Sequence, residues 1–174
     1  MLPPNAFFQT AWVVNDLQAA MNHWVKTANV GPFFVNAHVR TSNVTYRGQP
    51  TGFDHSLALA QAGPVQIELI EQHSDVPSVY RDSYPKGKEG FHHLGCFVDD
   101  VAAEVARYQA QGVELAYNGM FGDMRFAYMD TRAQLGHMIE IIEHKPFIDK
   151  LFKHVADAAM GWDGRDPIRK FPAL

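Results

Sequence analysis

The sequence predicts an α+β fold made of two βαβββ modules and a C-terminal helix. The first observation behind this prediction is an internal repeat: a strand that runs directly into a capped helix occurs at residues 8–17 and again 84 residues later. Gln9 in the first copy stands where His93 stands in the second, and Asp16 stands where Asp100 does. A chain that carries one supersecondary unit twice is interpreted first as a repeat.

The second observation is the order of elements, which is the same in both halves. Each predicted helix is followed by three strand-like stretches that are separated by turns rich in Gly and polar residues. We therefore expect one module over residues 6–72 and another over residues 90–144, together forming a single domain over residues 1–145. Residues 146–174 are expected to form a helix and a tail.

The first module begins with an apolar stretch at residues 6–14 that suits a strand, and Asn15 or Asp16 then caps a helix over about residues 16–28. The apolar face of this helix comes from residues at i, i+4 and i+7, namely Leu17, Met21 and Trp24. Residues 40–52 are polar and contain Gly48, Pro50 and Gly52, which indicates a long loop. The three further strands of this module are predicted at 33–35, 54–60 and 65–71.

The second module follows a linker at residues 72–90, which is longer than an ordinary turn. Its first strand is predicted at residues 91–98, and its helix ends just before Gly112. Its other strands are predicted at 113–117, 125–129 and 137–142, with a turn at 119–122 and a loop at 130–136. Pro146 suits the first turn of the C-terminal helix, and residues 162–174 are expected to be irregular.

The composition is that of an ordinary globular protein, and it excludes several functions. The net charge of −4 argues against nucleic acid and anionic membranes as partners, and no segment has the length of a membrane-spanning helix. The single cysteine, Cys96, cannot form an internal disulfide, which suits a reducing cytoplasm. Strand alternation puts Cys96 on the face opposite His93, so it is expected to be a small buried residue.

Four polar residues lie within otherwise apolar strands and form the candidate site. Gln9 and Glu68 fall on the first and fourth strands of the first module, and His93 and Glu140 on the same strands of the second. Each of them alone fits an ordinary structural role, because a strand glutamate usually faces solvent. As a set they occupy equivalent positions of a repeat, and two carboxylates in one cavity repel each other unless a proton or cation lies between them. A divalent metal with one amide, one imidazole and two carboxylate ligands resolves that conflict.

These residues resemble a known family. The repeated module, with Phe91-His92-His93-Leu94-Gly95 and Gly136-His137-Met138-Ile139-Glu140, is similar to the vicinal oxygen chelate superfamily, which includes glyoxalase I, methylmalonyl-CoA epimerase, extradiol dioxygenases and bleomycin-resistance proteins. The resemblance covers roughly residues 6–144. It implies two cupped half-barrels, one divalent ion (zinc, nickel, cobalt, manganese or magnesium) and a homodimer. It also implies that the ion is held by Gln9, Glu68, His93 and Glu140.

The branch of the superfamily is left open by three departures from the family patterns. Glyoxalase I places arginines near the glutathione carboxylates, where this chain has Val13 and Glu89. The epimerases carry His and Gln where this chain has Gln9 and Glu68. The ring-cleaving dioxygenases use a first histidine ligand on iron, which Gln9 replaces here.

The predicted function is therefore a metal-dependent isomerase or lyase acting on a small molecule. It would remove a proton next to a carbonyl or thioester through an enediolate, with the metal as Lewis acid. Glu140 is the first candidate for the base and Glu68 the second, while His55 and His92 are weaker candidates. The alternatives are a non-catalytic small-molecule-binding protein and an iron-dependent ring-cleaving dioxygenase. His92 is expected to face solvent or to support His93 from behind.

A CoA ester would need cationic groups at the mouth of the cup. The sequence offers five candidates for this role: Arg40, Arg47, Lys86, Lys88 and Arg125. Aromatic residues near the predicted cavity would equally suit a hydrophobic substrate. Those considered are Phe7, Trp12, Phe34, Phe97, Phe126 and Tyr128.

Overall fold

A computed structural model describes residues 6–172, so the first five residues of the predicted domain and the last two of the predicted tail lie outside the described range. The strands are β1 (Phe7–Val13), β2 (Phe33–Asn36), β3 (Ser42–Tyr46), β4 (Gln49–Pro50), β5 (His55–Ala62), β6 (Val65–Gln72), β7 (Gly90–Val98), β8 (Glu114–Phe121), β9 (Met124–Asp130), β10 (Met138–Glu143) and β11 (Ile168–Lys170). The helices are α1 (Leu17–Ala28), α2 (Val79–Ser83), α3 (Val101–Gln109), α4 (Arg132–Leu135) and α5 (Pro146–Ala159).

The predicted repeat is confirmed in the arrangement of the strands. All strands form one mixed sheet in the order β11-β2-β5-β6-β1-β7-β10-β9-β8-β3-β4. Outward from the centre, β1-β6-β5-β2 of the first module mirrors β7-β10-β9-β8 of the second. The two first strands, β1 and β7, pair antiparallel and join the modules. The first and last strands of the two modules, β1, β6, β7 and β10, therefore occupy the centre of the sheet.

The repeated helix start is also confirmed at the level of single hydrogen bonds. Asp16 Oδ1 accepts from the Ala19 backbone N–H at 2.8 Å, and Asp100 Oδ1 accepts from the Ala103 N–H at 3.0 Å. Both aspartates have extended backbone angles, as an N-cap requires. The same local chemistry thus ends β1 and β7 and starts α1 and α3.

The sheet cannot be flat, because of one short connection. β2 and β3 lie eight positions apart in the sheet, which would separate them by about 38 Å if the strands lay side by side at about 4.8 Å. Only residues 37–41 join them, and a chain of that length reaches about 22 Å at most. The sheet must therefore curl into an open cup, with residues 37–41 crossing between its two edges.

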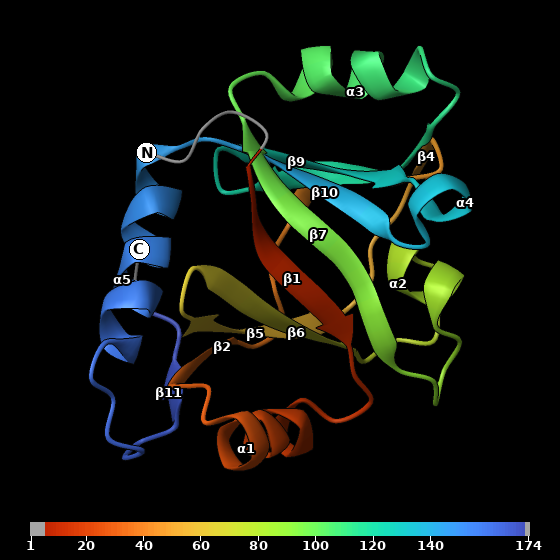
Figure 1. Ribbon diagram of the computed structural model, residues 1–174. Coiled ribbons are helices and arrows are strands. Elements are labelled where there is room, and N and C mark those ends of the chain that lie inside the picture. The colour runs from red at the N-terminus through yellow and green to blue at the C-terminus, as the bar shows by residue number, and fades with distance from the viewer. Residues whose placement is uncertain (1–5, 173–174) are drawn as a thin grey trace.

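The layers follow from the alternation of the strands. In Figure 1, β9 and β10 lie above, β5 and β6 below, and β1 and β7 run between them. α1 covers the outside of the lower part, where Leu17 and Met21 pack against the faces of β5 and β6 that point away from the cup. α3 covers the upper part in the same way, over Cys96 and its neighbours. Cys96 is 2% exposed, as expected from its position.

α5 lies along one side of the cup and closes it (Figure 1). Pro146 occupies the first turn of this helix, as predicted. Its buried residues Ile148 and Leu151 belong to the main core between the modules, and Val155 packs with Phe34 and Leu59. No helix among residues 6–172 is both long and apolar enough to cross a membrane.

Several segments predicted as loops contain regular structure. Residues 40–52 form β3 and β4, and β3 pairs with β8 of the second module. The linker contains α2, the loop at 130–136 contains α4, and β8 continues to Phe121 through the predicted turn. The tail contains β11, which pairs with β2. The strand predictions were wrong because β3 and β11 take their hydrogen bonds from strands distant in sequence rather than from a local apolar pattern, and β4 pairs with β3.

An ion-pair network fixes the β3–β4 hairpin to the second module. Arg47, which follows β3, contacts Asp82 at 2.7 Å and Asp130 at 2.9 Å. Arg132 contacts the same Asp130 at 2.7 Å and donates to the backbone carbonyl of Asp82 at 2.6 Å. This network joins the hairpin, α2 and the end of β9, and so anchors the β3–β4 edge of the sheet to the second module and the linker.

Candidate metal centre

The register of the four central strands brings the predicted site residues together. Glu68, Ala11 and His93 are direct neighbours across β6, β1 and β7. In the next row on the same face, Gln9 of β1 and Glu140 of β10 both lie opposite Gly95 of β7. Two polar rows are thus stacked. In each row a small residue, Ala11 or Gly95, lies between the two polar residues and leaves room for their side chains to converge.

Three of the four predicted residues meet at a single point. His93 Nε2 lies 3.3 Å from Glu68 Oε2 and 3.2 Å from Glu140 Oε2. One nitrogen or oxygen from each of these three buried residues lies within 4.8 Å of the other two, as in a group that can hold a metal ion. Despite these short distances, His93 Nε2 and Glu68 Oε2 have no hydrogen-bond partner with acceptable geometry. Leaving buried polar atoms unpaired is costly, and a cation held between them would satisfy both.

Gln9 adds a fourth oxygen to the same cavity. Its side-chain Nε2 donates to Gln66 Oε1 at 2.7 Å, and this bond directs the amide oxygen the other way. Gln9 Oε1 is buried and has no hydrogen-bond partner. A Cβ placed on Gly95 would lie only 2.6 Å from this oxygen, so the glycine is what makes room for it. Gln66, which the sequence analysis did not single out, therefore orients a candidate ligand.

His92 fixes which nitrogen of His93 is free. His92 Nε2 lies 3.1 Å from the carbonyl oxygen of Val79, so it carries the hydrogen and donates. His92 Nδ1 then accepts from His93 Nδ1–H at 2.9 Å. His93 Nε2 is consequently left with its lone pair toward Glu68 and Glu140, as a ligand nitrogen requires. Of the two places expected for His92, the solvent-facing one is wrong, since its exposed fraction is 1%.

The electrostatics of the site follow from burial and from the two acids. Burial lowers the pKa of His92 to about 3, helped by repulsion from His93, so His92 is neutral at physiological pH. Burial also opposes charge on His93, but its contacts with Glu140 and Glu68 raise its pKa to about 9. Burial raises the pKa of Glu68, partly offset by the contact with His93. Without a cation the site would therefore hold a proton between its acids and His93.

The site opens into a cavity of about 90 Å³ within the cup. Its walls come from both modules and from the C-terminal segment, with Tyr117, Phe126 and Tyr128 on the second module, Phe152 on α5 and Phe171 after β11. Of the aromatic residues considered from the sequence, Phe126 and Tyr128 line the cavity. Phe97, which was also considered, stacks instead on the core residue Phe8, with ring centroids 4.4 Å apart.

Two further cavity residues come from places that the sequence analysis weighed little. Tyr80 on α2 is 3% exposed, and its hydroxyl lies 3.4 Å from that of Tyr128. Burial raises the pKa of both hydroxyls well above the ordinary value, so both remain proton donors. His55 is 4% exposed, lines the cavity, and has an unpartnered Nδ1. The only sequence signal for Tyr80 was an apolar pair, Val79-Tyr80, after the capping Ser78 in a polar linker.

Comparison with known proteins identifies the family. Residues 8–128 match the family described as the glyoxalase/bleomycin resistance protein/dioxygenase superfamily. The chain belongs to this superfamily. The resemblance stated from the motifs of β7 and β10 is therefore correct. No protein with a curated description matches the chain.

Solved structures share the fold of this superfamily member at low sequence identity. Methylmalonyl-CoA epimerase from Mycobacterium tuberculosis is 20% identical, with a TM-score of 0.54 over 86% of this chain and 97% of that one. A methylmalonyl-CoA epimerase in complex with methylmalonyl-CoA and NH4+ is 16% identical, with a TM-score of 0.55 over 83% and 97%. A hypothetical protein from Bacillus halodurans is 18% identical, with a TM-score of 0.55 over 82% and 96%.

Proposed function

We propose that this protein is a metal-dependent isomerase or lyase that removes a proton beside a carbonyl or thioester group, in the manner of an epimerase or of glyoxalase I. The observation that carries the proposal is the set of buried, unpartnered atoms Gln9 Oε1, Glu68 Oε2 and His93 Nε2 beside Glu140. One amide, one imidazole and two carboxylates suit a divalent ion such as zinc, nickel, cobalt, manganese or magnesium. Such an ion, when bound, supplies Lewis acidity toward a substrate oxygen.

Glu140 is the group we assign to proton transfer. It lines the cavity and its side chain is 12% exposed, against 8% for Glu68, so it is the more accessible of the two acids. Its position opposite Tyr128, a buried hydroxyl donor, places an acceptor and a donor of protons on neighbouring strands. Glu68, deeper in the site, is the second candidate, and transfer between the two faces of one carbon needs a group on each side.

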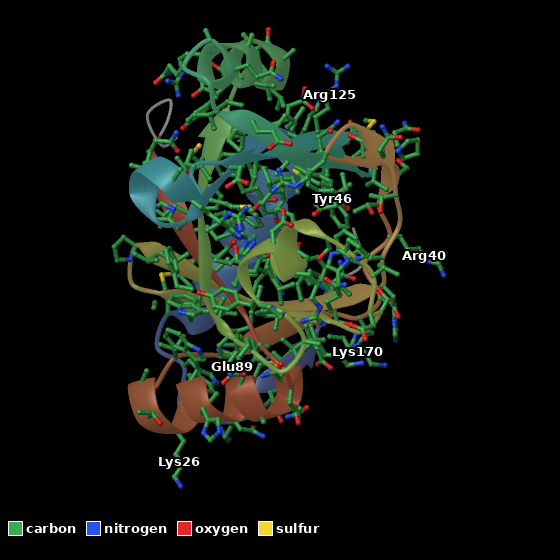
Figure 2. The ribbon with its side chains drawn as sticks, turned by 90° about the vertical axis from the view of Figure 1, so that its right-hand side faces the viewer. Lys26, Arg40, Tyr46, Glu89, Arg125 and Lys170 are labelled. Atoms are coloured by element: carbon green, nitrogen blue, oxygen red, sulfur yellow. The ribbon has the colours of Figure 1, made fainter. Side chains whose placement is uncertain are left out.

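The cavity walls favour an uncharged and partly apolar substrate portion. No Lys or Arg lines the cavity within residues 6–172. Of the cations considered for a CoA ester, Arg47 is engaged by Asp82 and Asp130, and Arg40 and Arg125 point outward from the body of the molecule (Figure 2). We therefore propose that only a small acyl or carbonyl portion enters the cup, and that any carrier group would stay outside it.

His55 is suited to contact the far end of that portion. Leu59 of β5 lies opposite Glu68, and His55 lies four residues before Leu59. His55 is therefore about 13 Å along the strand from the position opposite Glu68. Burial lowers the pKa of His55 to about 4, so it is neutral at pH 7. Its free Nδ1 can then exchange a hydrogen bond with a polar group of the substrate. The variant His55→Phe should raise KM more than it lowers kcat.

The test is proton exchange, because it needs no prior choice between epimerase and lyase. The metal-loaded protein is incubated in D2O with a panel of α-hydroxy ketones, hemithioacetals and acyl thioesters, and loss of the C–H signal beside the carbonyl is followed by NMR. Glu140→Gln should reduce exchange at least 100-fold while the circular dichroism spectrum stays unchanged. Glu143→Gln is the matched control on the same strand, since Glu143 accepts from the Arg125 backbone N–H outside the cavity.

Metal content separates the proposal from its alternatives. One non-iron divalent ion per chain after purification, with exchange activity, supports it. Iron together with oxygen uptake would indicate a dioxygenase, and a tightly bound small molecule without metal or turnover would indicate a binding protein. Intact metal content and exchange activity in Glu140→Gln would remove Glu140 from the mechanism.

A further inference from the structure

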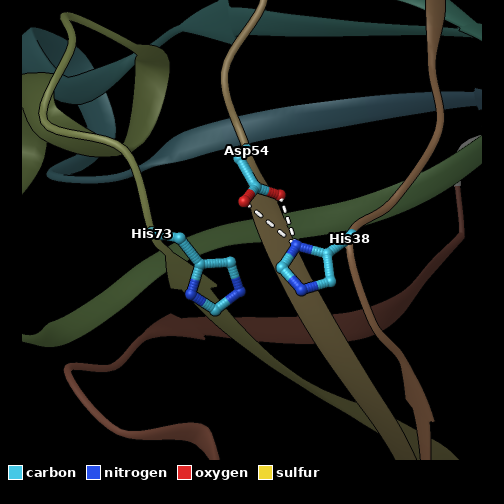
Figure 3. A group of neighbouring side chains, drawn as sticks. All are labelled: His38, Asp54 and His73. Atoms are coloured by element: carbon cyan, nitrogen blue, oxygen red, sulfur yellow. Dashed lines mark hydrogen bonds and ion pairs between the residues drawn. The ribbon is translucent and has the colours of Figure 1, made fainter.

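A second group of metal-binding side chains lies outside the cavity and takes no part in the proposed function. His38 comes from the connection at residues 37–41, Asp54 precedes β5, and His73 follows β6. One nitrogen or oxygen from each lies within 4.8 Å of the other two. Figure 3 shows the two imidazole rings flanking the Asp54 carboxylate. Three segments distant in sequence thus bring two histidines and one acid to one place.

The side chain of His73 presents the lone pair of Nε2 to the Ser56 hydroxyl, the partner that a bound ion would displace. The Ser56 hydroxyl oxygen accepts from the His38 backbone N–H at 3.0 Å, so its own hydrogen is free to point to His73 Nε2, which lies at 2.7 Å. On the other side of the ring, His73 Nδ1 lies 3.4 Å from Glu71 Oε1, which favours the hydrogen on Nδ1. A carboxylate behind one ring nitrogen is the usual support for a histidine that binds metal through the other.

His38 Nδ1 lies 2.8 and 3.0 Å from the two oxygens of Asp54. The two side chains thus form a hydrogen-bonded pair, and neighbouring ligands around a tetrahedral ion with bonds of about 2.1 Å lie about 3.4 Å apart, so an ion could replace the shared hydrogen after a small movement. His38 also has a φ of 52°, a left-handed conformation that non-glycine residues rarely adopt. The Asp54 contact and the bond to Ser56 hold the residue in this conformation, which directs its ring toward the acid.

We propose that His38, Asp54 and His73 form an outer site for a borderline divalent cation, of which Zn²⁺ is the probe. Two imidazoles and one carboxylate suit Zn²⁺, Cu²⁺ or Ni²⁺, with water completing the shell. The side chains of His38 and Asp54 are 69% and 47% exposed, so the ion enters directly from solvent and binds less tightly than at a buried site. Glu71 supports His73 through Nδ1, and the ion would replace the Ser56 hydrogen at Nε2.

A cation here would hold the wall of the cavity in place. Val39 and Thr41, on the same connection as His38, line the cavity, and the Val39 N–H donates to the His55 carbonyl at 2.9 Å. Joining His38 to Asp54 and His73 therefore fixes the connection to the ends of β5 and β6. The outer ion would thus stabilise the mouth of the cup without contacting the inner ligands.

The experiment is equilibrium dialysis of the purified full chain against Zn²⁺. The wild-type chain should bind two ions, and Asp54→Asn and His73→Gln should each bind one. Asp75→Asn, at an exposed aspartate that pairs with Lys86, is the matched control and should bind two. Glu71→Gln should weaken the second binding step about tenfold, because it removes the carboxylate behind His73 Nδ1. Excess Zn²⁺ should slow hydrogen exchange at the Val39 and Thr41 amides in the wild type but not in Asp54→Asn.

His93→Gln separates this proposal from the inner site, because it should lose one ion and keep the one removed by Asp54→Asn. If the wild-type chain binds one ion, and Asp54→Asn keeps this ion while His93→Gln loses it, the outer site alone is overturned. If the wild-type chain binds one ion, and Asp54→Asn loses this ion while His93→Gln keeps it, the inner site alone is overturned. Two ions that are both kept in Asp54→Asn, or none at all, overturn the outer site as well. Circular dichroism of each variant checks that the fold is unchanged.

Discussion

Gly95 gives the sharpest test of whether the Gln9 amide is a ligand, because it changes the site without removing any candidate ligand atom. In Gly95→Ala the new Cβ would lie 2.6 Å from Gln9 Oε1 and 3.1 Å from Gln9 Cβ, whereas ordinary contact begins at 3.4 Å. The amide oxygen must therefore move by about 0.8 Å. It cannot simply rotate, because Nε2 of the same amide is held by Gln66 at 2.7 Å.

Two effects follow from this displacement. Misplacing a ligand or its support typically costs 10- to 100-fold in metal affinity, or about 1.4 to 2.7 kcal/mol. Overpacking a well-packed position costs about 1 to 3 kcal/mol of unfolding free energy. For a chain of this length, a loss of about 2 kcal/mol lowers Tm by roughly 4 to 8 °C. Zn²⁺ titration and calorimetry of the metal-free protein measure the two effects separately.

Gly52→Ala is the matched control for the same chemical change. No atom lies within 4 Å of the Cβ that this substitution would add. Its unfolding free energy should stay within about 0.5 kcal/mol of the wild type, and its metal affinity should not change. If Gly95→Ala binds Zn²⁺ within threefold of the wild type while its Tm falls, the Gln9 oxygen is not a ligand and the reasoning from its unpartnered state fails.

Three further predictions concern the support of the site, the ion-pair network and the buried thiol. His92→Phe removes the acceptor that fixes the His93 tautomer, so Zn²⁺ affinity should fall 10- to 100-fold; wild-type affinity in the metal titration would contradict this role of His92. Arg132 first, and then Arg47, hold the pKa of Asp130 well below its usual 3.8. The ionised carboxylate therefore stabilises the folded protein above pH 3.8, and this stabilisation is lost as the pH falls and Asp130 becomes protonated. Asp130→Asn should cost about 1 to 2 kcal/mol at pH 7 in urea unfolding, and the difference should shrink from about pH 5 downward; a pH-independent difference would refute this origin. Burial raises the pKa of Cys96 to about 12, so iodoacetamide at pH 8 should modify it in guanidinium but not in the native state, as mass spectrometry would reveal.

Local patterns in the sequence determine much of this fold. The repeat carries its own capping chemistry, since Asp16 and Asp100 each bond an amide three residues ahead. Strand alternation alone separates His93 from Cys96, and these side chains do lie on opposite faces, one in the cup and one under α3. Apolar periodicity and the caps also locate α1, α3 and α5. These features depend on residues within one helix or strand, so a single sequence is enough to predict them.

The edges of the sheet could not be predicted in this way. β3, β4 and β11 are short; β3 pairs with β8, β11 pairs with β2, and β4 is added to the edge by pairing with β3. The partners of β11 are about 135 residues away along the chain, and no local periodicity encodes such a pairing. The curl of the sheet has the same origin, because it follows from the short connection at residues 37–41 between two opposite edges.

For the candidate site, the sequence determined which residue types stand at equivalent positions of the repeat: Gln9, Glu68, His93 and Glu140. Only the tertiary structure decided which of their atoms are left without partners, because that depends on Gln66 turning the amide of Gln9 and on His92 fixing the proton of His93. It also decided that Tyr80 and His55 face the cavity and that the available cations do not. Side-chain direction and hydrogen-bond partners are properties of packed neighbours, and such neighbours are assembled only when the two halves of the chain come together.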